Sequence, residues 1–276
     1  MGKLDGKVAV ITGGGRGIGR EIAFKLGRDG ARIVVNDLDA EPNDEVVSAL
    51  GGEGIEAVAC PGSVTAPDFA DRLIGTATKS FGTIHIIVNN AGYTWDSVVQ
   101  KTTDEQWYAM LDVHLTAPFR ILRAAQPVIK AAHQADLQAG RHVVRKVVNT
   151  SSVAGLFGNV GQSGYSAGKA GIIGFTQTLA KEWGRLQTTV NCVAYGLIRT
   201  RLTDAEAGGG SSATIAGNDI KLGVNSAVMD QMERSIPLGR VGTPEDAAAA
   251  AYLFCIPESD YVSGQVLLCS GGMTGM

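Results

Sequence analysis

The chain has 276 residues, of which 45% are hydrophobic, with a formal net charge of −3, a mean hydropathy of +0.09 and a pI near 5.8. This length and composition allow one α/β domain with a large core, and the acidic balance gives no basic surface for nucleic acid. No apolar run reaches the eighteen or so residues that span a bilayer, and the N-terminus lacks an apolar signal region, so we expect a cytoplasmic protein.

The four cysteines are widely separated in the sequence, and no two of them form a C-x-x-C pair. They are Cys60, Cys192, Cys255 and Cys269. This spacing indicates neither a disulfide framework nor a zinc site. We therefore expect buried thiols and no bound metal.

Apolar runs of β type alternate with segments of helical period along the whole chain. The predicted strands are residues 7–12, 32–37, 55–60, 84–89, 144–150, 188–193 and 265–269. Because parallel neighbours need crossover connections, this alternation predicts a Rossmann-type, doubly wound, seven-stranded parallel sheet with helices on both faces. Helix starts are predicted at Thr65 through Asp68, at Thr103-Asp104, and at Thr243 followed by Pro244.

The first strand leads into a glycine-rich turn and then an amphipathic helical segment. The turn is Gly13-Gly14-Gly15-Arg16-Gly17-Ile18-Gly19, and the helical segment runs from Arg20 to Arg28. Glycines let a ligand approach the main chain closely, and the free amides at the start of a helix attract a pyrophosphate. The alternative is a plain connection from strand to helix.

The second strand ends in Asp37, about twenty residues past the turn. This completes a βαβ unit and places an acid where a cofactor ribose would lie. A carboxylate accepts hydrogen bonds from the 2′ and 3′ hydroxyls and repels a 2′-phosphate, which favours NAD over NADP. Arg16 points the other way, because a guanidinium in the turn can pair with a phosphate.

Tyr165 and Lys169 stand four residues apart, and Ser152 precedes Tyr165 by thirteen residues. Side chains at i and i+4 share a helix face, so the ammonium can sit beside the phenol and lower its pKa. Such a phenol is a usable general acid or base near neutral pH. Tyr and Lys at this spacing are also common on a solvated helix face.

Two stretches depart from the regular alternation. Residues 133–146 form a polar, partly basic extension after a long helix, and residues 203–235 form a mixed insertion after the sixth strand. Open α/β sheets bind ligands at the carboxyl edge that this insertion follows. We therefore expect one domain over residues 1–276, with a substrate lid at about 200–236.

The ordered set of motifs closely resembles the short-chain dehydrogenase/reductase family. The set comprises the glycine turn, Asp37, Asn89-Asn90-Ala91-Gly92, Ser152 and Tyr165-x-x-x-Lys169. The resemblance covers about residues 4 to 272. It implies that Ser152 hydrogen-bonds the reacting oxygen of the substrate, that Tyr165 transfers the proton, and that Lys169 holds the nicotinamide ribose and lowers the pKa of Tyr165.

The resemblance also implies a set of cofactor-binding residues. These are Gly13, Gly15, Arg16, Gly17, Ile18, Gly19, Asp37, Leu38, Ser63, Val64, Asn90, Ala91, Gly92, Tyr165, Lys169, Gly196, Ile198 and Thr200. Three positions depart from the family pattern. His114 stands where many members have an Asn that holds a water beside the lysine, Ser63 stands where an Asp commonly meets the adenine, and Tyr195 stands where Pro is usual. His114 can donate and accept like that Asn, and is a candidate catalytic residue, or it can be an ordinary helix histidine.

The resemblance implies a reaction on a secondary alcohol or ketone, with a 3-oxoacyl or 3-hydroxyacyl thioester as the leading substrate. The stretch Gly158-Asn159-Val160-Gly161-Gln162 is similar to that of 3-oxoacyl-ACP reductases and hydroxyacyl-CoA enzymes. The alternatives are a steroid, cyclic or other secondary alcohol, a non-catalytic NAD(H)-binding sensor, and a structural role through residues 203–235. Family members are commonly homotetramers or homodimers, so we expect one of these assemblies.

Overall fold

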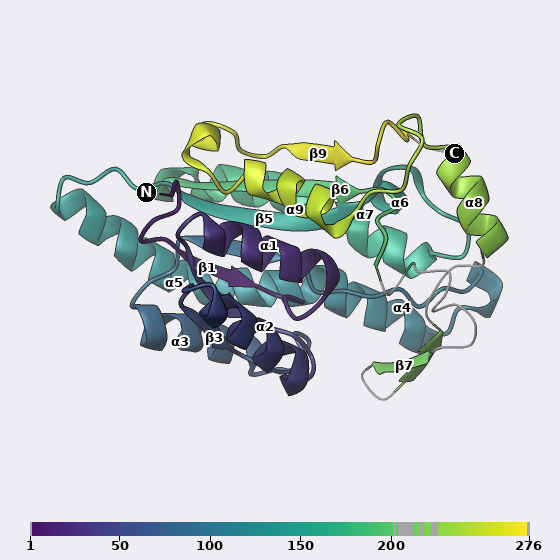
Figure 1. Ribbon diagram of the computed structural model, residues 1–276, viewed down its shortest axis with the longest axis horizontal. Coiled ribbons are helices and arrows are strands. Elements are labelled where there is room, and N and C mark those ends of the chain that lie inside the picture. The colour runs from purple at the N-terminus through teal and green to yellow at the C-terminus, as the bar shows by residue number, and fades with distance from the viewer. Residues whose placement is uncertain (1, 201–202, 204–211, 216–217, 222–225, 275–276) are drawn as a thin grey trace.

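The computed structural model contains one sheet of seven parallel strands, in the order β3-β2-β1-β4-β5-β6-β9 (Figure 1). The structure describes residues 2–200, 203, 212–215, 218–221 and 226–274. These strands are β1 Val8–Ile11, β2 Arg32–Val35, β3 Ala57–Ala59, β4 Ile86–Asn89, β5 Arg145–Ser152, β6 Thr188–Tyr195 and β9 Val266–Cys269. The fold class and all seven strands predicted from the sequence are confirmed. Because the strand order reverses between β1 and β4, a ligand crevice is expected at the carboxyl ends of these two strands.

Helices cover both faces of the sheet. The helices α1 (Gly17–Arg28), α2 (Ala40–Gly52) and α9 (Pro244–Leu253) lie in front of it in Figure 1. The other face packs against α3 (Phe69–Phe81), α5 (Ala117–Gln138) and α7 (Ser163–Trp183), with α4 (Asp104–Leu111) against α7. A short helix, α6 (Val153–Phe157), follows β5 directly.

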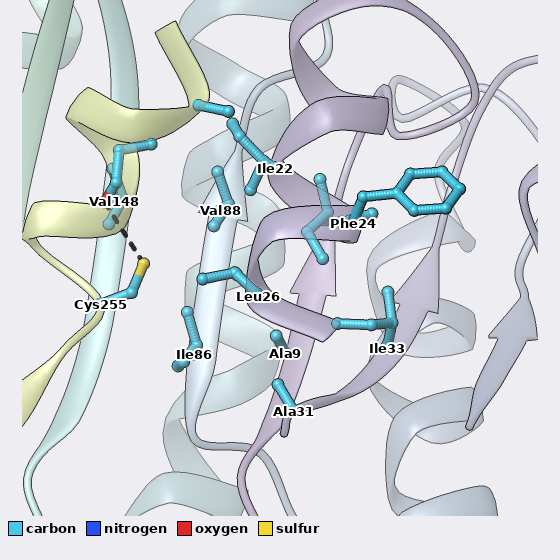
Figure 2. Packing of buried hydrophobic residues seen from close by; sticks show 14 of the residues in the cluster. Ala9, Ile22, Phe24, Leu26, Ala31, Ile33, Ile86, Val88, Val148 and Cys255 are labelled. Atoms are coloured by element: carbon cyan, nitrogen blue, oxygen red, sulfur yellow. Dashed lines mark hydrogen bonds between the residues drawn. The ribbon is translucent and has the colours of Figure 1, made fainter. Parts of the chain in front are cut away.

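Successive residues of a strand serve the two cores in turn. Ala9 and Ile11 of β1 belong to the core under α1, α2 and α9, part of which is drawn in Figure 2, whereas Val10 belongs to the core under α3, α5 and α7. Side chains of a strand point alternately to opposite faces, so a strand buried on both faces must be apolar throughout. This is why the predicted strands read as continuous apolar runs.

The carboxyl ends of β1 and β4 are tied together by one hydroxyl group. Thr12 Oγ1 accepts hydrogen bonds from the backbone amides of Asn90 and Ala91 at 3.0 and 3.1 Å. The Asn90 side chain returns across the gap and donates to the carbonyl oxygens of Thr12 and Gly13, both at 3.1 Å. The glycine turn and the segment after β4 are therefore held in a fixed relation at the expected crevice.

The predicted extension at residues 133–146 is wrong in its first half. The helix α5 continues to Gln138, and β5 begins at Arg145, so the irregular connection is short. Asp136 in the last turns of α5 pairs with Arg145, at 2.8 Å, and with Arg141, at 2.9 Å. These ion pairs join the end of α5 to the start of β5 and explain why a polar stretch stays helical.

The predicted lid at about 200–236 falls partly outside the described residues. Within it, β7 (Ser212–Ile215) and β8 (Asn218–Lys221) form an antiparallel pair separate from the main sheet, and α8 spans Ser226–Arg234. The sequence did not predict this hairpin. Leu197, Met229, Ile236 and Val241 form a small buried cluster that connects α8 to the segment after β6.

The start of α9 is fixed by reciprocal hydrogen bonds. Thr243 Oγ1 accepts from the backbone amide of Asp246, and the Asp246 carboxylate accepts from the backbone amide of Thr243 at 2.9 Å. This confirms the helix start predicted at Thr243. Because α9 packs against α1, the cap also supports the helix that follows the glycine turn.

We expect Thr243→Ala to lower the free energy of unfolding by about 1 kcal/mol, because one backbone amide of α9 loses its acceptor. Urea denaturation at pH 7 measures this loss. Thr243→Ser keeps the hydroxyl and is the matched control, expected close to the wild type. Equal losses in the two variants would show that the methyl group, and not the cap, carries the effect.

Candidate active site

The glycine turn joins β1 to α1 with its backbone close to the segment after β4. Gly13 has a φ of +62°, a conformation that favours glycine, and a Cβ on Gly19 would overlap the Gly13 carbonyl oxygen. The residue before α1, Arg16, makes no side-chain capping hydrogen bond, and the first turn of α1 holds no acid. The first amides of α1 are therefore available to an anion such as a pyrophosphate.

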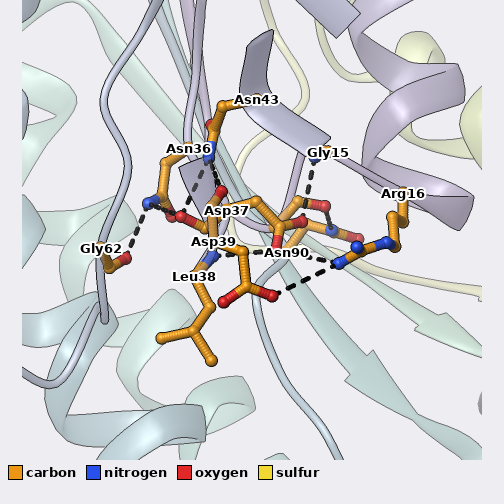
Figure 3. A network of polar contacts seen from close by, with 10 residues as sticks. Gly15, Arg16, Asn36, Asp37, Leu38, Asp39, Asn43, Gly62 and Asn90 are labelled. Atoms are coloured by element: carbon orange, nitrogen blue, oxygen red, sulfur yellow. Dashed lines mark hydrogen bonds and ion pairs between the residues drawn. The ribbon is translucent and has the colours of Figure 1, made fainter. Parts of the chain in front are cut away.

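Asp37 lies at the end of β2 against this turn (Figure 3). Its carboxylate accepts from the backbone amides of Gly15, at 3.1 Å, and Leu38, at 2.8 Å. Arg16 Nη1 lies 4.0 Å from the Asp37 carboxylate and 3.8 Å from that of Asp39. The guanidinium that could have met a phosphate thus faces two carboxylates.

The backbone around Asp37 is held by two buried amides that the sequence reading missed. Asn43 on α2 donates to the carbonyl oxygens of Asp37 and Asp39. Asn36 donates to the carbonyl oxygens of Asp37 and of Gly62, at 3.2 and 2.9 Å. The carboxylate is therefore a preformed acceptor at the edge of the turn, with the 60–62 segment beside it.

A cavity of about 630 Å³ opens at the carboxyl ends of β1, β4, β5 and β6. It is lined by Ile18, Asn90, Gly92, Tyr93, Thr94, Trp95, Asp96, His114, Thr150, Ser151, Ser152, Gln162, Tyr165, Lys169, Tyr195, Gly196, Ile198, Thr200, Thr203 and Ile220. The structure thus brings all four predicted catalytic residues to one cavity, together with predicted cofactor residues from the turn, from the segment after β4 and from the loop after β6. Its size and its mixed lining suit a small-molecule site.

Ser152 and Tyr165 reach the cavity from different elements. Ser152 ends β5, is buried, and accepts from the backbone amide of Ala154 at 3.2 Å. Tyr165 lies in the first turn of α7. Ser151 is less suited to the reaction, because its hydroxyl donates to the Lys169 carbonyl oxygen at 2.6 Å. The geometry therefore favours Ser152 over its neighbour.

The pKa of Tyr165 differs from the sequence-based expectation. Burial raises the pKa of the phenol above its usual value near 10, the hydrogen bond with Ser152 lowers it, and the Asp96 carboxylate raises it. The net shift is upward, so the phenol is protonated at neutral pH. The expectation of a phenol made acidic by its neighbouring ammonium is not met in this arrangement.

Lys169 explains part of that difference. It is buried, and its Nζ donates to the Thr150 carbonyl oxygen at 2.9 Å while lying 5.7 Å from the centre of the Tyr165 ring. Burial lowers the pKa of the ammonium to about 8. A group that is part neutral near pH 8 and bound to a carbonyl exerts less pull on the phenol than a full, free charge would.

His114 lies in a π-helical turn, Asp112–Thr116, between α4 and α5. Its ring meets that of Tyr165 edge to face, with centroids 4.9 Å apart. Nε2 is 2.7 Å from the Tyr93 carbonyl oxygen, which can only accept, so Nε2 carries the proton. Burial and the Lys169 charge hold the pKa of His114 well below its usual range, and the ring is neutral.

The neutral tautomer leaves His114 Nδ1 as a buried acceptor that has no hydrogen-bond partner among the described residues. Short π-helical turns inside helices frequently mark functional sites. The ring thus has one donor, which the Tyr93 carbonyl oxygen already accepts, and one acceptor, Nδ1, that no described residue uses.

Some predicted cofactor residues lie outside the cavity lining. Leu38 is exposed beside Asp37, Val64 is packed in the core with α3, and the Ser63 hydroxyl bonds that of Thr65 at 2.8 Å. Tyr195, by contrast, lines the cavity; it is buried, and its hydroxyl donates to the Ala247 carbonyl oxygen at 3.1 Å. It ties the end of β6 to α9.

The lining residues that sequence reasoning missed include a group after β4 and one residue before α7. They are Tyr93, Thr94, Trp95, Asp96 and Gln162, of which Gln162 was noted only as part of the stretch that resembles 3-oxoacyl-ACP reductases. The only available signal was their position after two recognised motifs, because aromatic and polar residues in loops carry no spacing rule.

The sheet, the turn and the cavity together define a dinucleotide-binding α/β oxidoreductase. Comparison with known proteins agrees, because residues 7–208 match the family model described as short chain dehydrogenase. The chain is 36% identical over 275 residues to a 3-oxoacyl-[acyl-carrier-protein] reductase of Synechocystis, with 99% of both chains covered. It is 33% identical over 270 residues to the corresponding reductase FabG of Vibrio cholerae, with 98% of both covered. An uncharacterised oxidoreductase of Mycobacterium tuberculosis is 35% identical, with 98% and 97% covered.

The chain belongs to the short-chain dehydrogenase family, and it is an NAD(P)-dependent oxidoreductase. Among the residues that the structure describes, no helix combines the length and the apolar character needed to cross a membrane.

Proposed function

We propose that the protein reduces the ketone of 3-oxoacyl thioesters, with NAD(H) as its cofactor and with the reverse oxidation using the same groups. The observation that carries the proposal is the presence of Ser152, Tyr165 and Lys169 in one cavity beside the glycine turn. The printed names of its relatives from Synechocystis and Vibrio cholerae, both 3-oxoacyl-[acyl-carrier-protein] reductases, support this substrate class.

The residues around the glycine turn fit a nicotinamide dinucleotide. The free amides at the start of α1 suit its pyrophosphate, and the Asp37 carboxylate suits its adenosine ribose. Asn90, Gly92, Gly196, Ile198 and Thr200 line the cavity toward Tyr165 and would surround the nicotinamide end. When bound, the nicotinamide supplies or accepts the hydride.

Ser152 and Tyr165 position the substrate in this proposal. Both hydroxyls donate hydrogen bonds to the ketone oxygen and stabilise the negative charge that develops on it. Tyr165 then gives its proton to that oxygen. A raised pKa suits this step, because the phenol enters the reaction protonated.

Lys169 contributes in two ways in this proposal, through the ribose of the cofactor and through the Tyr165 phenol. Its buried Nζ lies in the cavity wall, where it can donate to a ribose hydroxyl as it does to Thr150. A cation that is held beside the phenol also stabilises the tyrosinate left after proton transfer. His114 would hold, through its free Nδ1, a water that returns the proton to the site.

The preference for NAD follows from charge at the turn. Asp37 presents a carboxylate at the proposed ribose site, which a 2′-phosphate would meet with repulsion. Arg16, which could offset this, faces the carboxylates of Asp37 and Asp39. The residues left for the adenine, Leu38, Ser63 and Val64, would contact it from the segments beside Asp37.

The lid and the assembly are part of the same proposal. Ile220 of β8 and Thr203 line the cavity, which supports a substrate-covering role for the segment of about residues 200–236 within a single domain.

Exposed apolar side chains on α4 and at the end of α9, such as Tyr108 and Leu253, support a homotetramer or homodimer. A non-catalytic sensor is less favoured, because the Ser, Tyr and Lys groups are all in place.

Replacing Tyr165 with Phe tests the catalytic assignment. We expect kcat for reduction of an acetoacetyl thioester to fall at least 1000-fold, because the proton donor is lost, with little change in NADH affinity measured by fluorescence titration. Tyr93→Phe removes a phenol oxygen from the same cavity and is expected to keep most activity. Loss of NADH binding with unchanged residual turnover would contradict the role given to Tyr165.

Replacing Asp37 with Ala tests the cofactor assignment. We expect the ratio of kcat/KM with NADH to that with NADPH to fall about tenfold or more, because the repulsion of the 2′-phosphate is removed. Asp44→Ala removes an exposed carboxylate from α2 and should leave the ratio near the wild-type value. An unaltered ratio in Asp37→Ala would show that selectivity is set elsewhere.

His114 is tested by its pH profile. His114→Asn keeps one donor and one acceptor, so we expect near wild-type kcat, whereas His114→Ala should slow turnover about tenfold or more. Because burial and the Lys169 charge hold the pKa of His114 well below 6.5, the ring is neutral at neutral pH, and the profile of kcat/KM above pH 7 should be the same in wild type and His114→Asn. Equal rates for the Asn and Ala variants would indicate a purely structural histidine.

A further inference from the structure

The substrate side of the cavity holds a carboxylate that the proposed reaction does not use. Asp96 lies in the loop after β4. Among the described residues that line the cavity, Asp96 and Lys169 are the two that carry a charge. Asp96 lines the cavity as an exposed residue, and partial desolvation by its surroundings raises the pKa of the carboxyl above its ordinary value.

Gln162 fixes the position of this carboxylate. The Gln162 amide donates to Asp96 Oδ2 at 2.8 Å, and its oxygen accepts from Asn159 at 3.0 Å. The loop itself is joined to the segment before α7, because the Ser97 amide donates to the Gly161 carbonyl oxygen at 2.7 Å. An acid is therefore held in one place at the start of the helix that carries Tyr165.

The charge of Asp96 reaches the reacting phenol. The Asp96 carboxylate is one of the groups that raise the pKa of Tyr165. A negative charge near enough to disfavour tyrosinate also disfavours any other anion placed beside the phenol. Lys169 is the opposing charge in the same lining, and its ammonium donates to the Thr150 carbonyl oxygen at 2.9 Å.

We propose that Asp96, held by Gln162, is a specificity-determining residue that excludes 3-oxo substrates with a free carboxylate and admits neutral esters and thioesters. This inference rests on the proposed function, since it assumes that the ketone oxygen meets Ser152 and Tyr165. The carboxylate of a free 3-oxo acid is only two carbons from that ketone, so it would lie in the cavity that Asp96 lines. A thioester carries no charge at the same carbon.

The exclusion strengthens as the substrate fills the cavity. In the open cavity water screens Asp96, but a bound substrate displaces this water, and like charges then repel more strongly. Discrimination of about tenfold or more between charged and neutral forms is expected from one such pair of like charges.

The experiment compares two 3-oxo compounds that differ only in charge, acetoacetate and ethyl acetoacetate. Asp96→Asn keeps the acceptor for Gln162 and removes the charge, so the ratio of kcat/KM for acetoacetate to that for the ester should rise about tenfold. Asp96→Glu keeps the charge, and Asp71→Asn removes an exposed carboxylate on α3 that does not line the cavity. Both controls should keep the wild-type ratio.

An unchanged ratio in Asp96→Asn, with ester reduction intact, would overturn the proposal, as would an equal rise in Asp71→Asn. A rise in the Asp96→Glu variant as large as in Asp96→Asn would show that shape and not charge decides. Acetoacetyl N-acetylcysteamine is assayed in parallel. If this thioester is not reduced, the proposed substrate class fails, but the charge test still stands on the inhibition constants of acetoacetate and its ester against whichever ketone the enzyme reduces.

Discussion

Two hydrogen bonds between β5 and α7 set the positions of all the proposed reacting groups. The Lys169 ammonium donates to the Thr150 carbonyl oxygen, and the Ser151 hydroxyl donates to the Lys169 carbonyl oxygen. They hold together a strand that ends in Ser152 and a helix that begins with Tyr165. Since catalytic groups must be held to within a fraction of an ångström, the alignment of serine and tyrosine depends on this junction. A buried ammonium is costly unless it is bonded, so the junction resists slipping.

The electrostatics of the site favour a proton donor. Burial raises the pKa of the Tyr165 phenol, and the ammonium of Lys169, with a pKa near 8, is the positive group close enough to stabilise the anion after the proton has left. A protonated phenol beside a cation matches what reduction of a ketone needs, because the donor carries its proton at the start and its conjugate base is stabilised at the end. Oxidation of an alcohol needs the phenol already ionised and is therefore favoured only as the pH rises.

The sequence predicted the sheet well because a parallel sheet covered on both faces leaves an unmistakable pattern of apolar runs. The cap at Thr243 was also predictable, since its partner Asp246 lies three residues away. The extension of α5 to Gln138 was missed because the ion pairs of Asp136 are made with residues beyond the helix, which local pattern does not show. The β7–β8 hairpin was missed because its strands are short and polar.

The candidate site also has features that local sequence spacing predicts and features that depend on the folded structure. Ser152, Tyr165 and Lys169 were proposed from their spacing. The direction of the Tyr165 pKa shift depends instead on burial and on Asp96, which lies 69 residues earlier in the sequence and which the fold brings to the same cavity. Spacing along a helix tells which groups can meet, but a pKa depends on everything that surrounds them. For this reason spacing was enough to propose Tyr165 as the proton donor, whereas the pKa of its phenol is shifted upward and not downward as the spacing suggested.

At the cofactor end of the site, the Asp37 carboxylate already accepts two backbone amides and still has acceptor positions for a ligand. A carboxylate has about four acceptor positions, and two of those on Asp37 receive the amides of Gly15 and Leu38. These bonds fix the orientation of the carboxylate and leave acceptor positions for the two hydroxyls of a ribose. Because the amides come from the turn and from the strand end themselves, the same contacts that shape the glycine turn also set the direction of the acceptor. In the proposed binding mode, a preference for the unphosphorylated ribose comes from the turn as a whole, because the Arg16 guanidinium faces carboxylates and the Asp37 carboxylate faces the ribose site.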